Sequence, residues 1–194
     1  MSGAVRIGVL AEQGGFASHL EHIASVGAIG SEVRSPWDLE GLDGLILPGG
    51  ESTTISMALE RDGLAEGIVA FAERGRPVLG TCAGMILLAR EHLGILDVSV
   101  VRNAFGRQLA SFEQELDIPE LAPGGSFPGV FIRAPWVDQA GNGVEVIAEI
   151  EGHPVAVRQG STIALSFHPE LTSDDRVHGS FVRMCEEARA SADG

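Results

Sequence analysis

Short apolar runs alternate with segments of helical period over the first ninety residues, and this alternation most constrains the fold. The runs at 5–10, 45–47 and 77–79 each lead into a glycine-containing turn. Continuous apolar runs of this length are typical of strands that are covered on both faces. The helical segments that follow them are expected at 16–26, 53–60, 64–74 and 85–90. Strands alternating with helices predict a three-layer α/β/α fold with a mostly parallel central sheet.

The second half of the chain has a different pattern, with short β-like runs separated by turn clusters. These runs lie at 98–101, 108–112, 130–133, 144–149 and 155–157. They predict antiparallel strands added to the edge or side of the sheet. A last buried strand is expected at 163–167 and a closing helix at 177–189. No repeat or linker divides the chain, so a single domain over 1–194 is expected.

The charge and the choice of cations exclude several classes of function. The 13 basic residues against 27 acidic ones give a net charge of −14, which makes nucleic acid a poor partner. All 13 cations are arginines, and the chain contains no lysine. This excludes an imine-forming lysine, a P-loop lysine and a lysine that anchors pyridoxal phosphate.

The cysteine content and the hydropathy indicate the compartment. Two cysteines do not form a disulfide framework or a metal cluster, so we expect neither a metal nor a cofactor. The start of the chain lacks the features of a secretory signal, and no apolar run is long enough to span a membrane. A cytoplasmic protein without a membrane partner is expected.

Cys82 is the first candidate for chemistry. It lies in Gly80-Thr81-Cys82-Ala83-Gly84, a G-x-C-x-G motif between a buried strand and a helix. The G-x-S-x-G nucleophile elbow occupies the same context, and its small flanking residues are expected to let the chain turn sharply. A helix N-terminus favours a thiolate. The alternative is a small buried cysteine, which is the interpretation that we give to Cys185.

A thiolate nucleophile needs a base and a group that orients the base, and His168-Pro169-Glu170 supplies both residue types. Pro169 favours an extended His168, and side chains two positions apart in an extended segment point to the same side. Glu170 can then accept the ring N–H of His168. The alternative is a strand-end histidine beside an exposed glutamate. The remaining histidines have no comparable partner and are interpreted as surface or packing residues.

A glycine-rich turn offers donors for an oxyanion. Leu47-Pro48-Gly49-Gly50-Glu51 passes from the end of a strand into a helix, where backbone N–H groups are unobstructed. Gly50 and Ala83, the residue after the candidate nucleophile, are the expected donors. Such a turn could equally bind a phosphate.

The segments LPGGEST, GTCAGMILLA and SFHPEL, taken together, resemble the class I glutamine amidotransferases. Their glutaminase domain has a flavodoxin-like fold and a Cys-His-Glu triad in this chain order. The segments VRNAFGRQLASFE and FPGVFIRAP are similar to the branch of that family that serves pyridoxal 5′-phosphate synthesis.

The resemblance implies that Cys82 is the nucleophile, His168 the general base and then acid, and Glu170 the orienting carboxylate. It implies a binding site for L-glutamine that is formed by Gly50, Glu51, Ser52, Arg102, Ile132 and Arg133. A forked arginine suits the α-carboxylate of the substrate. Gln13 would lie near the oxyanion region, and Glu12 departs from the apolar residue expected before it.

Three functions follow from this sequence. The first is a glutaminase that passes ammonia to a lysine-bearing pyridoxal 5′-phosphate synthase subunit in a heteromeric complex, because imine chemistry cannot take place on a chain without lysine. The second couples the same glutaminase to another synthase, such as that of histidine biosynthesis. The third is a non-catalytic binding protein of the same fold, in which the cysteine would lack a functional His-Glu pair.

Overall fold

A seven-stranded sheet in the order β2-β1-β3-β4-β11-β10-β9 forms the centre of the computed structural model, which describes residues 3–12, 14–106 and 110–192. The strands from β2 to β11 in this order are mutually parallel, and β10 and β9 continue the sheet in antiparallel fashion. The strands of the sheet are β1 (Arg6–Leu10), β2 (Ile29–Val33), β3 (Gly44–Leu47), β4 (Val78–Thr81), β9 (Glu145–Ile150), β10 (His153–Gln159) and β11 (Thr162–Leu165). The predicted fold class, an α/β fold with a mostly parallel sheet and added antiparallel strands, is confirmed.

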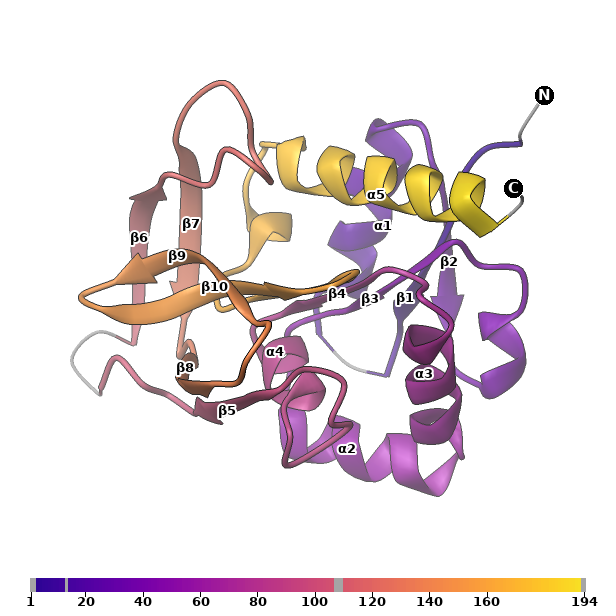
Figure 1. The fold of residues 1–194 in the computed structure, drawn as a ribbon, viewed down its shortest axis with the longest axis horizontal. Coiled ribbons are helices and arrows are strands. Elements are labelled where there is room, and N and C mark those ends of the chain that lie inside the picture. The colour runs from indigo at the N-terminus through magenta and orange to yellow at the C-terminus, as the bar shows by residue number, and fades with distance from the viewer. Residues whose placement is uncertain (1–2, 13, 107–109, 193–194) are drawn as a thin grey trace.

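Helices cover both faces of this sheet (Figure 1). The helices are α1 (Phe16–Ser25), α2 (Ser52–Arg61), α3 (Leu64–Glu73), α4 (Ala83–Leu88) and α5 (Arg176–Ala192), with 3₁₀ turns η1 (Pro36–Leu39) and η2 (Pro169–Leu171). Ile23 of α1 and Phe181 of α5 pack in one apolar cluster. Ile55 of α2, Ile68 of α3 and Met85 of α4 pack in a second one. The parallel strands β1, β3, β4 and β11 are therefore almost entirely buried, as the apolar runs predicted for the first three and for the last strand.

Two small antiparallel sheets lie beside the main one. One pairs β5 (Val98–Val101) with β8 (Trp136–Ala140), and the other pairs β6 (Ser111–Leu116) with β7 (Phe127–Ile132). Part of the strand expected at 108–112 lies outside the described residues. The observed strand β6 includes the last two expected positions and extends to Leu116. The strands β2 and β8 were not predicted. Both carry polar or small residues that leave much of their length exposed, so neither shows a clear apolar period.

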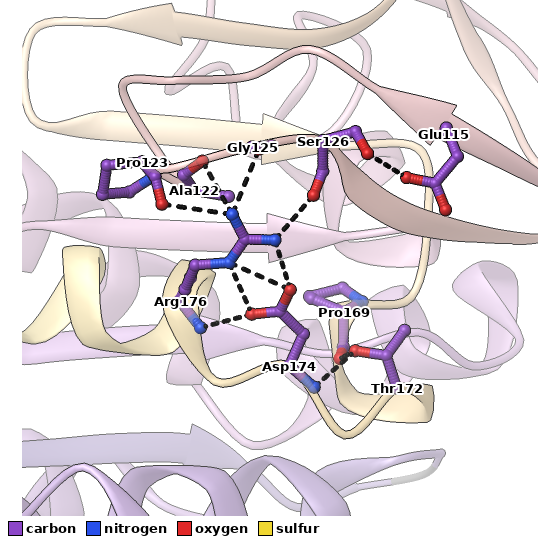
Figure 2. Close-up of polar contacts among 9 residues, drawn as sticks. All are labelled: Glu115, Ala122, Pro123, Gly125, Ser126, Pro169, Thr172, Asp174 and Arg176. Carbon is purple, nitrogen blue, oxygen red and sulfur yellow. Dashed lines mark hydrogen bonds and ion pairs between the residues drawn. The ribbon is translucent and has the colours of Figure 1, made fainter.

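Arg176 fixes the segment that connects η2 to α5 (Figure 2). Its guanidinium donates hydrogen bonds to the carbonyls of Ala122, Pro123, Gly125 and Ser126 and pairs with Asp174. The Asp174 amide in turn donates to Thr172 Oγ1, which donates to the Pro169 carbonyl. The planar fork of arginine thus ties the loop before β7 to the chain that follows η2.

Within the part of the chain that the structure describes, no helix is both long and apolar enough to cross a bilayer.

Candidate active site

Cys82 lies at the junction between β4 and α4. Its backbone has a conformation that residues other than glycine rarely adopt. Its φ is 49° and its ψ is −104°, and it is the N-terminal cap residue of α4. The Cys82 amide donates to the Leu165 carbonyl of β11 at 2.8 Å, which fixes the junction. Such strain costs on the order of 1–3 kcal/mol and persists only where the surrounding structure imposes it.

The two glycines of the G-x-C-x-G motif provide space rather than a turn. The positive φ belongs to Cys82, whereas Gly80 and Gly84 are not among the glycines with positive φ. A Cβ on Gly84 would collide with the Leu47 carbonyl of β3, and one on Gly80 would lie 2.7 Å from the Gly84 backbone. The glycines therefore permit the sharp turn at Cys82 by letting α4 approach the sheet closely.

His168 and Glu170 meet beside Cys82, through a local geometry that differs from the predicted one. His168 Nδ1 lies 2.7 Å from Glu170 Oε1. The segment is not extended as expected, because Pro169–Leu171 form the 3₁₀ turn η2. Gly49 lies against both residues, since a Cβ there would be 2.5 Å from His168 Cε1 and 3.4 Å from Cys82 Cβ. The structure therefore brings Cys82, His168 and Glu170 together.

The charges in this cluster reinforce one another. Burial by itself lowers the pKa of His168, but hydrogen bonds to Cys82 and Glu170 and the charges of both groups raise it to about 10. Burial by itself raises the pKa of Glu170, yet the contacts with His168 and His19 lower it below its usual value. The imidazole therefore carries a proton at neutral pH next to a charged carboxylate, as a general acid requires.

A pocket of about 130 Å³ opens in front of Cys82. It is lined by Gly50, Glu51, Ser52, Cys82, Ala83, Ile86, Arg102, Asn103, Ile132 and Arg133. Every residue that the sequence assigned to the glutamine site is in this set. Ile86 and Asn103 were not predicted; Asn103 has a φ of 48°, a conformation that asparagine tolerates better than most residues.

The N-terminus of α2 forms one wall of the pocket. The Glu51 carboxylate accepts hydrogen bonds from the Thr54 hydroxyl and the amides of Thr53 and Thr54, and these lower its pKa to about 2. Arg102 Nη2 contacts Ser52 Oγ and lies 3.5 Å from Glu51 Oε1. Glu51 therefore caps a helix, and it holds Arg102 against that helix.

Arg133 also lines the pocket, and its guanidinium makes fewer contacts than that of Arg102. Its φ is 45°, and its amide donates to the Ala110 carbonyl at 2.6 Å. Within the described ranges its guanidinium takes part in no ion pair. Of the two arginines that line the pocket, Arg133 is thus the one whose fork is open to an anionic group.

The two candidate oxyanion donors also line the pocket. Ala83 is the first residue of α4, so its N–H has no acceptor within the helix. Gly50 precedes the α2 cap. Gly14, with a φ of 90°, is packed against the Gly49 carbonyl, so the loop before α1 contacts this turn. Gln13, which was expected near the same region, lies outside the described residues.

A larger groove, of about 670 Å³, lies between β6 and β9 and carries different chemistry. Its lining includes the acidic residues Glu115, Asp117, Glu149 and Glu151 but no cysteine or histidine. A groove of this kind has no nucleophile, so the smaller pocket at Cys82 is the candidate active site.

The interpretation of the other histidines as surface or packing residues without a comparable partner is wrong for His22, whose ring contacts the Asp175 carboxylate, and also for His19. This residue is fully buried in α1, and its Nε2 lies 3.3 Å from Glu170 Oε2. The same nitrogen lies 3.3 Å from Thr81 Oγ1, and Nδ1 lies 2.9 Å from His178 Nε2. Sequence alone offered one indirect signal, a histidine on the inner face of the first helix, and nothing that linked it to Glu170.

The chain is similar to known proteins over nearly its whole length. The model of the SNO glutamine amidotransferase family matches residues 9–187. The chain is 48% identical to "Pyridoxal 5′-phosphate synthase subunit PdxT" of Geobacillus kaustophilus, over 97% of this chain and 98% of that protein. It is 51% identical to the protein of the same name from Streptomyces avermitilis, over 94% of this chain and 95% of that one.

A solved structure described as a glutamine amidotransferase superposes with a TM-score of 0.87 at 46% identity, covering 93% of this chain and 98% of that one. A putative GMP synthase subunit from Thermoplasma acidophilum superposes with a TM-score of 0.79 at 17% identity, covering 100% of both chains, and supports the fold alone.

The pKa of His168 provides a direct test of the cluster. Because a hydrogen bond and charge from Cys82 help to raise this pKa to about 10, Cys82→Ala is expected to lower it. The measurement is an NMR titration of the His168 ring in the wild-type chain and in the variant. An unchanged midpoint would show that Cys82 and His168 do not interact.

Proposed function

The chain belongs to the SNO glutamine amidotransferase family, and from this membership we propose that it is the glutaminase subunit of a pyridoxal 5′-phosphate synthase. It hydrolyses L-glutamine to L-glutamate and ammonia, and the ammonia passes to a synthase subunit. We also propose that residues 1–194 form one glutaminase domain, because both apolar clusters pack on the same sheet.

One observation supports the chemistry above all others. A strained cysteine, a protonated histidine and a charged glutamate adjoin in chain order 82, 168 and 170, beside a pocket small enough for an amino acid. A non-catalytic protein of this fold would not need the His168-Glu170 contact, so this alternative finds no support.

In the proposed first step, Cys82 Sγ attacks the side-chain amide carbon of glutamine as a thiolate. The amide oxygen becomes an oxyanion, which the N–H groups of Gly50 and Ala83 stabilise. His168 then donates its proton to the leaving nitrogen, so that ammonia departs and a glutamyl thioester remains on Cys82.

In the second step, His168 takes a proton from water as the water attacks the thioester carbonyl. The C–S bond breaks and releases glutamate, and Cys82 and His168 return to their starting state. Glu170 stays ionised and orients the imidazole throughout.

The substrate is held by its amino-acid end. We propose that Arg133 pairs with the α-carboxylate of glutamine, since its guanidinium is uncommitted among the described residues and Arg102 is held by Ser52 and Glu51. Gly50, Glu51, Ser52, Arg102 and Ile132 form the rest of the surface along the bound glutamine.

The composition supports a division of labour with the partner. The absence of lysine means that imine chemistry cannot occur on this chain. We therefore propose that the partner synthase subunit carries the reactive lysine and consumes the ammonia. Direct transfer within a complex avoids its loss to solvent.

Three variants test the nucleophile and its base. Cys82→Ala and His168→Asn are expected to lower glutamine hydrolysis by about 10⁴-fold or more, since loss of either proton-exchanging group disables the unit. Cys185→Ala is the control, because Cys185 is buried and burial raises the pKa of its thiol, which keeps it unreactive. Ammonia and glutamate release are measured with the synthase subunit in excess. Ordinary turnover in Cys82→Ala would refute the assignment.

Arg133 is tested separately through binding. Arg133→Ala is expected to raise the KM for glutamine roughly thirtyfold, because a charge-assisted bidentate contact contributes about 2 kcal/mol. Steady-state kinetics with the synthase subunit present give KM and kcat. Arg158→Ala, an arginine on the far strand β10, is the matched control. A KM equal to that of the wild type would remove Arg133 from the glutamine site.

A further inference from the structure

A buried pair of histidines lies behind Glu170, on the side away from His168. His19 belongs to α1 and His178 to α5, and their side chains are almost completely inaccessible to solvent. His178 Nε2 lies 2.9 Å from His19 Nδ1, and His19 Nε2 faces Glu170 Oε2 at 3.3 Å. Helices distant in the sequence thus bring one imidazole to the carboxylate of the proposed triad and place a second imidazole behind the first.

Both imidazoles are neutral at physiological pH. Burial lowers the pKa of His19 to about 4, although Glu170 opposes this shift. Burial and the neighbouring His19 and His22 lower the pKa of His178 to about 2. Each ring therefore carries one N–H, and the hydrogen bond between the two rings allows only two arrangements of these protons.

The surroundings select one arrangement. If His19 carried its proton on Nδ1, the lone pair on Nε2 would face the charged Glu170, and the proton of His178 would lie on Nδ1. That atom is buried and has no hydrogen-bond partner among the described residues. In the opposite arrangement His178 Nε2–H donates to His19 Nδ1, and His19 Nε2–H points toward the carboxylate. A buried lone pair without a partner is more common in proteins than a buried N–H without one.

Glu170 Oε2 needs such a donor. His168 uses Oε1, and Oε2 is buried without a hydrogen bond of good geometry in the described part of the chain. An unsatisfied buried carboxylate oxygen is costly. Catalytic contacts are often loose before substrate binds and tighten in the complex, so a donor at 3.3 Å is well placed to close.

We propose that His19 is a positioning residue for the proposed glutaminase reaction, and that its Nε2–H holds the second oxygen of Glu170 while His168 binds the first. The inference rests on the proposed function of the triad. The same N–H also lies 3.3 Å from Thr81 Oγ1, directly before Cys82, so His19 bridges the nucleophile strand and the carboxylate.

The surroundings of Glu170 indicate what loss of His19 does. The titratable groups that face this carboxylate in the described structure are His168 from its own segment and His19 from α1. β7 also packs against η2 and carries no titratable residue, and Cys82 lies beyond His168. His178 and His22 follow behind His19, and their rings stack with centroids 4.5 Å apart. Removing the His19 donor therefore raises the pKa of Glu170.

The test compares His19→Gln with His19→Met, two side chains of similar length of which only glutamine has an N–H. With the synthase subunit present, His19→Met is expected to lower kcat about 10- to 100-fold by loosening Glu170, with KM for glutamine within about twofold. The acidic limb of its profile of kcat against pH is expected to move up by roughly one unit, because protonation of Glu170 now occurs at higher pH. His19→Gln is expected to recover most of the wild-type kcat and most of the wild-type pH profile. His92→Met, at an exposed histidine, is the control.

The outcomes separate this inference from the proposed function. Equal kcat values and pH profiles for the Gln and Met variants, with a wild type that hydrolyses glutamine, would overturn the role of His19 alone. Turnover that persists in Cys82→Ala would overturn the proposed function instead.

A second measurement needs no variant. Nitrogen-15 NMR of the full chain at pH 7 is expected to show His19 protonated at Nε2 and unprotonated at Nδ1. The opposite tautomer would contradict the proposal even if the His19 variants failed to fold.

Discussion

The strained backbone of Cys82 is the constraint on which the site depends. Its positive φ is imposed by β4 before it, α4 after it and the hydrogen bond from its amide to Leu165 of β11. Gly80 and Gly84 make this possible because α4 can then approach the carbonyl of Leu47 closely. The parallel sheet thus supplies the rigidity that keeps the sulfur of Cys82 at its carboxyl edge, where the strand ends of an open α/β sheet form the binding crevice.

The electrostatics of the site are organised in layers behind that sulfur. His168 is charged because Cys82 and Glu170 outweigh its burial, whereas His19 and His178 are neutral because burial dominates. Charge is therefore confined to the groups nearest the pocket, and the neutral His19 lies behind them with its Nε2 3.3 Å from Glu170 Oε2. This arrangement stabilises a carboxylate in the interior without adding a further buried charge.

Much of the parallel sheet and the three residues Cys82, His168 and Glu170 could be predicted from local sequence patterns. The parallel strands are continuous apolar runs, and Cys82 and the His168-Glu170 pair lie within short motifs whose spacing is diagnostic. Two features of the site could not be predicted from the sequence. The 3₁₀ turn at Pro169 is decided by packing against β7 and α1, so the predicted extended segment was wrong although the contact was right. His19 meets Glu170 only because α1 and η2 pack together, a contact that no local pattern encodes.

The most direct test of the account is to trap the covalent step. A glutamine analogue with an electrophilic carbon in place of the side-chain amide is incubated with the complex of this chain and the synthase subunit, and the labelled residue is mapped by peptide mass spectrometry. We expect one adduct per chain, on Cys82; excess glutamine prevents its formation, and Cys185 carries none. Labelling at another residue, or labelling of Cys82 that glutamine does not slow, would contradict this expectation.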